Sequence, residues 1–313
     1  MDLYALYKRS WWETQCFYHA LAALGREGLI LCFPDRPYIC LGIHDDGKAE
    51  IDAVFCDGGG LPLIRRKIGG GVVYLDESQF FYQVVLGRDH PLIPAGRREA
   101  FFERMLTPAM NVLSRRFFME VSRRSPADLL CDGGKCAGSG VGEIGAAVAF
   151  AGNILLDFRP RIMAGALRSP HPAFTGLLAE AMTANIRTVR SYTRGELPPA
   201  ELLTDWFCEE FETVLGDLRP CSPDEELEAK ALELKEELTA PAWLWKKGRR
   251  TAHRRVKIRE GVYLSCHEKN GRLFALESES GTVTKAYRLD GGGAAALACP
   301  ERVTPEQWLE EIR

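Results

Sequence analysis

The segment RRKIGGGVVYLD (residues 65–76) decides the interpretation of this chain. Apolar, β-rich residues on both sides predict two strands, and three glycines at residues 69–71 join them. Consecutive glycines cost conformational entropy on folding, and they are useful where a ligand must approach the main chain without a Cβ in the way. The basic residues 65–67 could neutralise a phosphate or a carboxylate. Taken alone, the segment supports a ligand-binding loop and a solvated turn about equally.

A second unusual segment, DLLCDGGKCAGSG, covers residues 128–140. Its DGG turn predicts a tight reversal between two strands, and Lys135 follows that turn. A lysine there could hold its charge against a phosphate or a developing oxyanion, although by itself it is more often an ordinary turn residue. The overlapping GVGEIG (residues 140–145) matches a dinucleotide-binding pattern, but the residues after it predict a strand and not the helix that this motif requires.

The remaining pattern predicts an α+β chain with one large and one small part. Ahead of the glycine segment, the sequence predicts a helix over residues 10–28, strands over 29–33 and 38–43, and a short helix over 48–60. Beyond the lysine segment it predicts a strand over 146–158, helices between 172 and 215, and a charged helix over 221–238 with Ser222 as its N-cap. After Pro241, alternating residues and glycine turns predict a small antiparallel sheet, followed by a short helix capped by Thr304.

The composition argues against several classes of protein. The chain has 313 residues, a net charge of −3 and a pI near 6.1, whereas proteins that bind nucleic acid or anionic membranes usually carry a basic excess. No stretch approaches the roughly 20 apolar residues needed to span a bilayer. The ten cysteines are scattered without a CxxC pair, so we expect reduced, mostly buried thiols and a cytosolic location. His44-Asp45-Asp46 could begin a metal site, but no further ligand is evident, and we predict a surface loop and no metal site.

Together, RRKIGGGVVYLD, the later DLLCDGGKCAGSG and the following NILLDF resemble the lipoate–protein ligase family and its biotin-ligase and octanoyltransferase relatives. That family carries a basic pair with a triple glycine and then a DG-x-K-x-x-G-S segment, and the order and separation match as well as the letters. The resemblance covers residues 10–215, and PAWLWKKG with the sheet after it more weakly resembles the accessory domain of two-domain ligases. It implies a large mixed-sheet catalytic domain of the biotin/lipoyl-ligase type over residues 1–220. A linker helix over 221–240, acting as a hinge, and a small α+β accessory domain over 241–313 would follow.

The resemblance implies an adenylate-forming ligase. Lipoate and ATP, with Mg²⁺ carried mainly by the ATP phosphates, would condense to lipoyl-AMP, and a lysine of an acceptor domain would then take the lipoyl group. The expected partner is a glycine-cleavage H-like or 2-oxoacid dehydrogenase E2-like domain, and the expected ligase is a monomer that binds neither nucleic acid nor membranes. Lys135 matches the family's catalytic lysine. The positions that match its ligand-binding residues are Arg66, Gly69, Gly70, Gly71, Val72, Tyr74, Asp128 (an adenosine-side contact) and Ser139.

Three positions depart from the family pattern. Ile68 stands where serine or threonine usually precedes the triple glycine, and Ala151 stands where a histidine usually precedes the glycine of the next strand. The stretch Gly140-Val141-Gly142-Glu143 lacks the arginine that commonly follows the GS pair. These departures leave the nucleotide contacts and the catalytic rate open, and they allow a ligase specialised for an unusual acceptor.

Two other functions also remain open at this stage. An ATP-independent octanoyl or lipoyl transferase would take its acyl group from a carrier thioester through a cysteine, and Cys131 and Cys136 are the local candidates. A non-catalytic lipoyl-domain binder with the same fold would account for the missing arginine and histidine. Pyrophosphate release in the presence of ATP, lipoate and acceptor would distinguish the ligase from both.

Overall fold

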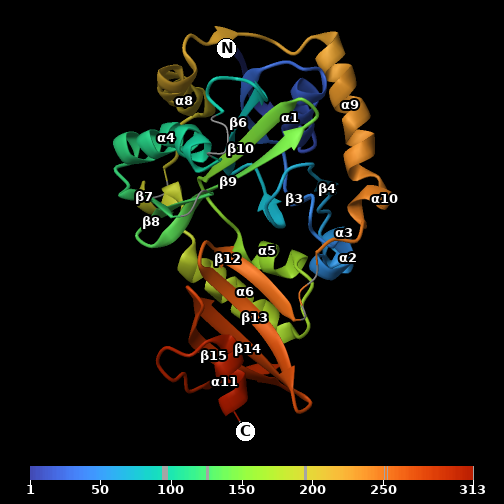
Figure 1. Cartoon of the computed structure of the whole chain (residues 1–313), viewed down its shortest axis with the longest axis vertical. Helices are drawn as coiled ribbons and strands as arrows, with labels where there is room; N and C mark the ends of the chain where they lie inside the picture. The colour runs from blue at the N-terminus through green and yellow to red at the C-terminus, as the bar shows by residue number, and fades with distance from the viewer. Residues whose placement is uncertain (94–97, 125–126, 194–195, 250, 252, 313) are drawn as a thin grey trace.

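Three β-sheets and the helices around them make up the described part of the chain, which confirms the predicted α+β class. The computed structural model describes residues 1–93, 98–124, 127–193, 196–249, 251 and 253–312. Two of the sheets and most of the helices form the upper body in Figure 1, and the third sheet lies below them. No helix in these described ranges is long and apolar enough to cross a membrane.

The largest sheet is mixed, as predicted. In order across the sheet, its strands are β11 (Arg219–Pro220), β1 (Asp2–Arg9), β2 (Gly28–Pro34), β6 (Gln79–Gly87), β10 (Ala147–Leu155), β9 (Gly134–Ile144), β8 (Asp128–Cys131) and β7 (Val121–Arg124). β1 runs parallel to β11 and β2, and the other neighbouring pairs are antiparallel. β1 is not among the predicted strands, because its buried side chains do not keep a regular alternation along the strand.

Helices cover both faces of this sheet (Figure 1). α4 (Arg98–Arg116) and α8 (Ala200–Leu215) share one apolar core with β6 and β10. α1 (Glu13–Ala23) and α9 (Glu225–Thr239) share a second core on the other face. α9 starts after the predicted cap, because Asp224 and not Ser222 accepts the hydrogen bond from the Leu227 amide.

A small three-stranded sheet stands against the large one. It has the order β4 (Leu63–Arg65), β3 (Tyr38–Leu41) and β5 (Val73–Leu75). The single helix predicted over residues 48–60 is instead two short helices, α2 (Gly47–Glu50) and α3 (Ala53–Gly58). The division has a local cause, since Asp46 accepts from the Ala49 amide and Asp52 accepts from the Phe55 amide, so each aspartate starts its own helix.

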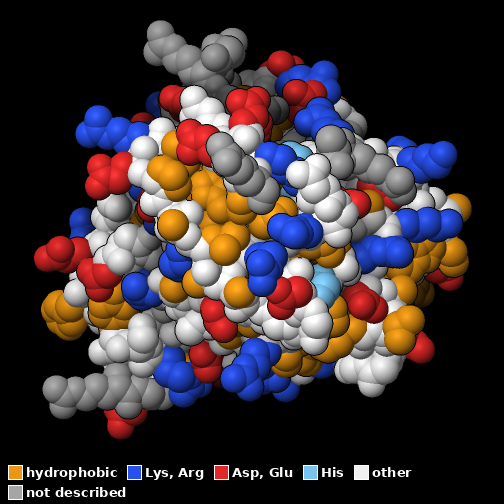
Figure 2. All heavy atoms as spheres, turned by 90° about the horizontal axis from the view of Figure 1, so that it is seen from below, with side chains coloured by type: hydrophobic (Ala, Val, Ile, Leu, Met, Phe, Trp, Pro, Cys, Tyr) orange, Lys and Arg blue, Asp and Glu red, His pale blue; other side chains and the backbone are white. Residues whose placement is uncertain are grey.

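The C-terminal segment forms the predicted antiparallel sheet. Its strands are β12 (Arg254–Arg259), β13 (Val262–Lys269), β14 (Arg272–Glu279), β15 (Thr282–Asp290) and β16 (Gly293–Leu297). The three predicted turns adopt positive φ at Gly261, Gly271 and Gly281, and α11 (Pro305–Glu311) carries the predicted capping box on Thr304. Figure 2 views this end of the molecule and shows acidic and basic side chains mixed around a hydrophobic area, without a continuous basic surface on this face.

Short helices join the C-terminal sheet to the upper body. α5 (Pro160–Ala166) lies between them in Figure 1, and α6 (Pro172–Asn185) contacts β12, β13 and β16 of the C-terminal sheet. α7 (Val189–Tyr192) precedes α8, and α10 (Pro241–Leu244) follows α9. One apolar cluster includes side chains of β3, α5, α6, β12 and β13. The C-terminal sheet therefore packs directly on the part of the chain that carries the two motifs. The proposed division at residues 221–240 contains α9 and stays a prediction.

Candidate active site

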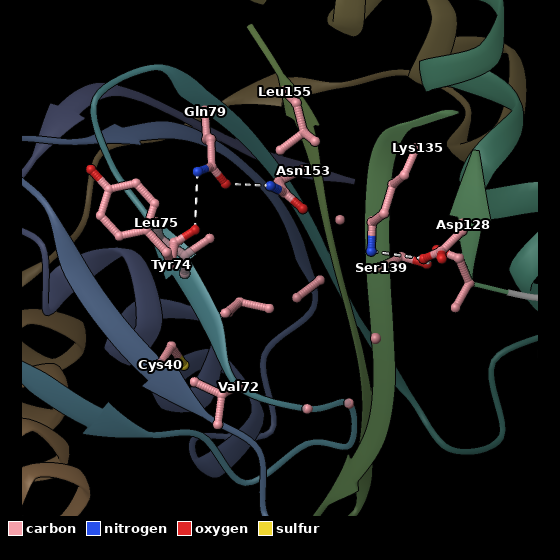
Figure 3. Close-up of a pocket in the computed structure, with 18 of the residues that line it drawn as sticks. Cys40, Val72, Tyr74, Leu75, Gln79, Asp128, Lys135, Ser139, Asn153 and Leu155 are labelled. Carbon is pink, nitrogen blue, oxygen red and sulfur yellow. Dashed lines mark hydrogen bonds and ion pairs between the residues drawn. The ribbon is translucent and has the colours of Figure 1, made fainter. Parts of the chain in front are cut away.

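A cavity of about 260 Å³ lies between the small sheet, strands β6, β9 and β10, and strand β12 of the C-terminal sheet. Most of the residues predicted from the two motifs meet on its wall: Arg66, Gly70, Gly71, Val72, Tyr74, Asp128, Lys135 and Ser139. Figure 3 shows Val72 and Tyr74 on one side, and Lys135, Asp128 and Ser139 on the other. Of the predicted site residues, Gly69 is the exception: its carbonyl instead accepts hydrogen bonds from Arg66. The glycine segment and the lysine thus share one cavity.

Lys135 is held by a buried carboxylate. Its Nζ lies 2.9 Å from Asp128 Oδ1, and Asp128 Oδ2 accepts a hydrogen bond from the Glu260 amide at 2.8 Å. Burial alone would raise the pKa of Asp128, but the charges of Lys135 and Lys257 and the two hydrogen bonds hold that pKa below its usual range. Asp128 is therefore charged at neutral pH and orients the ammonium group. Its predicted adenosine-side contact stays a prediction, since both oxygens bond within the protein.

Arg66 shapes the glycine loop. Each of its three guanidinium nitrogens donates to a main-chain carbonyl, of Gly69, Gly71 or Cys40. Gly70 has a φ of +100°, and a Cβ there would lie 2.5 Å from Arg66 Nη2, whereas a Cβ on Gly71 would meet nothing within 4 Å. Gly70 is therefore required by the loop itself, while Gly71 offers bare main chain to open space. Arg66 could bond a phosphate only by giving up one of these carbonyls or its contact with Cys40 Sγ, so its predicted ligand contact stays a prediction.

The other two basic residues of the motif contact α9 and α10. Arg65 is fully buried, does not line the cavity, and donates to the carbonyls of Asp45 and Leu244 at 2.7 Å each. The Trp243 indole returns a hydrogen bond to the Arg65 carbonyl at 2.9 Å. Lys67 forms an ion pair with Glu237 of α9 at 2.8 Å. Of the three basic residues, Arg66 lines the cavity, and Arg65 and Lys67 do not. The prediction that all three neutralise a ligand is therefore wrong.

The predicted hydroxyl groups are engaged inside the protein. The Tyr74 hydroxyl donates to Asp76 Oδ2 at 2.8 Å, and Ser139 Oγ donates to the Ala127 carbonyl at 2.9 Å. Ser139 ties β9 to the residue that precedes β8, next to Asp128. Any contact of these two hydroxyls with a ligand stays a prediction.

Sequence reasoning missed the residues that the C-terminal sheet adds to the wall. Lys257, Ile258 and Arg259 of β12 line the cavity beside the Lys135 pair. Burial alone would lower the pKa of Lys257, but the hydrogen bond to Glu260 and the charge of Asp128 raise it above its usual range. The alternating pattern predicted this strand but carried no signal about which surface the strand would face.

The two cysteines considered for a transferase lie outside the cavity. The Cys131 thiol donates to the Tyr192 hydroxyl at 2.9 Å, and the Cys136 thiol donates to the Leu129 carbonyl at 3.4 Å. Burial raises the pKa of both thiols. The thiol that does line the cavity is Cys40, which sequence reasoning missed; burial also raises its pKa, while Arg66 partly offsets that increase.

Two of the departures from the family pattern have local explanations. Ile68 is buried, and its side chain lies 3.0 Å from the position that a Cβ on Gly142 would take. The larger residue in the loop therefore fits a strand that carries glycine opposite it. Ala151 lines the cavity and pairs with Gln83 across β10 and β6, so its small side chain leaves space beside that glutamine.

The HDD segment has structural roles. Asp45 Oδ2 accepts from the Gly42 amide at 2.7 Å, and Asp46 caps α2. Among the described residues, no group of three or more His, Cys, Asp or Glu side chains is arranged to hold a metal ion.

The cavity combines three features that an acyl-activating site requires. A fixed ammonium group can stabilise negative charge on a phosphate or carbonyl oxygen. Bare main chain at Gly71 allows a close approach, and apolar side chains such as Val72, Leu75 and Phe81 can receive an acyl chain. Lys257 and Arg259 of the C-terminal sheet add further positive charge to the same wall.

A family model described as the lipoyl protein ligase A/B catalytic domain matches residues 7–211. No curated protein sequence matches the chain. Solved structures share the fold at low identity. A bipartite lipoate protein ligase from Thermoplasma acidophilum, described with its E2 lipoyl domain, has a TM-score of 0.68 and 19% identity over 80% of this chain and 98% of that one.

Two further structures are similar. A lipoate-protein ligase A bound with ATP has a TM-score of 0.64 and 17% identity, over 78% of this chain and 98% of that one. P. falciparum LipL1 in complex with lipoate has a TM-score of 0.61 and 13% identity, over 99% of this chain and 87% of that one. The last likeness extends over the C-terminal sheet as well as the upper body.

Proposed function

Because this chain belongs to the lipoyl protein ligase A/B catalytic-domain family, we propose that it is an ATP-dependent lipoate–protein ligase. The lipoate carboxylate attacks the α-phosphorus of ATP, which forms lipoyl-AMP and releases pyrophosphate. The amine of an acceptor lysine then attacks the acyl carbonyl, so that an amide forms and AMP leaves. The ATP-bound and lipoate-bound structures that share this fold support the choice of ligands.

One observation carries the proposal: the Lys135 ammonium and the bare Gly71 main chain open into the same partly apolar cavity. In the proposed reaction, Lys135 stabilises charge on the phosphate and carbonyl oxygens, and Asp128 holds it in position. Gly70 and Arg66 keep the loop in shape. These assignments rest on position and chemistry.

We propose that Mg²⁺ arrives with the ATP phosphates. The carboxylate that lines the cavity is Asp128, and both of its oxygens already bond to Lys135 and to the Glu260 amide. The ion would neutralise phosphate charge, while the protein contributes the ammonium groups of Lys135 and Lys257.

The proposed partner is a lipoyl domain of the H-protein or E2 type, in line with the Thermoplasma ligase that is described with its E2 lipoyl domain. A cytosolic location is proposed from cysteine usage: all ten cysteines lie in described residues and are free thiols.

The test is pyrophosphate release by the full chain with ATP, lipoate and a lipoyl-domain acceptor, together with mass spectrometry of the acceptor. A ligase requires ATP for both signals. Acceptor modification from an octanoyl-carrier thioester without ATP, lost in Cys40→Ser, would establish the transferase instead. Cys131→Ser and Cys136→Ser serve as matched controls, because those thiols lie outside the cavity. Binding of the acceptor without either activity would establish the non-catalytic binder.

A further inference from the structure

One residue of the cavity wall, Gln83, has a buried polar atom without a hydrogen-bond partner. Gln83 lies in β6 and is only 2% exposed, and its Oε1 is one of the few buried side-chain oxygens without a hydrogen bond in the described part of the chain. A buried acceptor of this kind costs free energy in the folded state unless a ligand or water supplies a donor.

The orientation of this amide is fixed by its other end. Gln83 Nε2 donates to the Thr14 carbonyl of α1 at 2.7 Å. Turning the amide over would place two oxygens against each other, so Nε2 must face Thr14 and Oε1 must remain the free acceptor. Gln83 Oε1 therefore requires a hydrogen-bond donor, and neither an apolar group nor a second acceptor can supply one.

The amide oxygens of Gln15 and Gln79, which also line the cavity, both accept hydrogen bonds. Gln15 Oε1 accepts from the Tyr18 hydroxyl at 3.2 Å, and Gln79 Oε1 accepts from Asn153 Nδ2 at 2.6 Å. Figure 3 shows the Gln79–Asn153 pair, whose neighbours across the cavity are Lys135 and Asp128. Both of these amides are satisfied within the protein, whereas Gln83 is not.

Gln83 is one of the buried residues of the cavity wall. It pairs with Ala151 across β6 and β10, and Cys40 and Phe81 of the same wall are also buried, while Lys135 is a quarter exposed. If a carboxylate reacts beside Lys135, its chain extends toward these buried residues, where the small Ala151 side chain leaves space next to Gln83.

From these observations we infer that the cavity selects a medium-chain carboxylic acid whose far end carries a hydrogen-bond donor, and that Gln83 is the residue that selects it. A terminal hydroxyl, thiol or N–H fits this description, whereas a plain alkyl chain and an oxidised dithiolane do not. Of the two redox forms of lipoate, the dithiol is therefore the better substrate. The inference rests on the proposed function for the direction in which the acid binds.

Whether the plain or the hydroxylated acid binds more tightly distinguishes a donor-selecting cavity from an ordinary apolar pocket. A plain chain leaves Oε1 buried without a donor, while a hydroxylated chain can supply the missing hydrogen bond. In an apolar pocket the hydroxyl would itself be buried unpaired, and the plain acid would bind more tightly.

The experiment is isothermal titration of the full chain, without ATP, with hexanoate, octanoate and decanoate and with their ω-hydroxy counterparts. At the best-fitting length we expect the hydroxy acid to bind about tenfold more tightly, the ratio expected for one hydrogen bond gained where an unpaired acceptor would otherwise remain. Dihydrolipoate and lipoate form a second pair with the same expected direction, and biotin tests a terminal N–H. Equal affinities or a preference for the plain acids would overturn the inference.

Two variants assign the effect to the residue. Gln83→Met should reduce the affinity ratio to about one, because it removes the acceptor at similar volume. Tyr82→Phe is the matched control: Tyr82 directly precedes Gln83 in β6, its hydroxyl is also buried without a partner, and it does not line the cavity. It should leave the ratio unchanged. A shift of the ratio in Tyr82→Phe, or an unchanged ratio in a folded Gln83→Met, would contradict the assignment.

The outcomes for this inference and for the proposed function are separable. Titration of acids does not require ATP, so a chain that prefers hydroxy acids but releases no pyrophosphate would support the inference and refute the ligase. A chain that adenylates lipoate without preferring donors would do the opposite. Loss of ATP affinity in Gln83→Met, with an unchanged acid preference, would place the adenine at this end of the cavity and overturn the inference.

Discussion

Replacing Lys135 by methionine should abolish adenylation and also weaken the fold. Methionine keeps much of the side-chain length but removes the charge that stands 2.9 Å from Asp128. Loss of one fixed electrostatic group at a developing charge costs about 10²–10³ in rate, equivalent to roughly 2.7–4 kcal/mol. Pyrophosphate release should therefore fall by at least two orders of magnitude.

The stability effect follows from Asp128, which loses its partner while it remains buried. Removing one member of a fully buried ion pair costs about 3–5 kcal/mol. Lys135 is 25% exposed, and the Glu260 amide still bonds to Asp128, so we expect about 2 kcal/mol in this protein. The depressed pKa of Asp128 stabilises the wild type above the ordinary carboxyl pKa, and that contribution is lost as the pH falls from there through the lowered pKa of the folded state. The stability difference between wild type and variant should thus shrink on acidification.

A double variant separates the two effects. Lys135→Met with Asp128→Asn removes both charges, so stability should return to within about 1 kcal/mol of wild type while adenylation stays lost. Urea unfolding and pyrophosphate release measure the two quantities. Wild-type-like adenylation in either variant would remove Lys135 from the reaction, and a single variant as stable as wild type at neutral pH would refute the account of the ion pair.

Three further predictions follow from the site. Lys257→Met should slow pyrophosphate release about tenfold without unfolding the chain, whereas Lys285→Met, in the same sheet but outside the cavity, should leave the rate unchanged; equal effects would deny Lys257 a role. Gly71→Val should raise the KM for lipoate with little change in Tm. Gly70→Ala should instead lower the Tm, because the residue has a positive φ and its Cβ would clash with Arg66. Steady-state kinetics and thermal melts measure the two effects, and a lower Tm in both variants would contradict this distinction. Arg65→Met should make the connection after α10 more sensitive to limited proteolysis, because it loses the hydrogen bonds to that segment, and an unchanged cleavage rate would contradict this.

Local sequence signals predicted much of the fold. The capping box on Thr304 and the turns at Gly261, Gly271 and Gly281 appear where they were predicted, because short-range chemistry determines them. The same holds for the hairpin that leads to Lys135. Where two local signals competed, prediction was wrong: residues 48–60 form two helices, since Asp46 and Asp52 each cap one.

Contacts between distant segments could not be predicted. Arg65 binds a carbonyl 179 residues away, and Asp128 accepts from an amide 132 residues away. Neither contact leaves a periodic pattern in the sequence, so the role of Arg65 in holding α10 and the hydrogen bond between Asp128 and the C-terminal sheet were not predicted. The family resemblance located the cavity, but only the packing of β12 revealed Lys257 on its wall.

The carboxylate of Asp128 serves the reaction centre and the C-terminal sheet at once. Thermodynamic reciprocity then requires each side to influence the other by the same free energy. A phosphate that draws Lys135 away changes the charge balance felt by the turn at Glu260, and displacement of that turn changes how firmly the ammonium is held. Amide hydrogen exchange at Glu260 should therefore report occupancy of a cavity that this residue does not itself line.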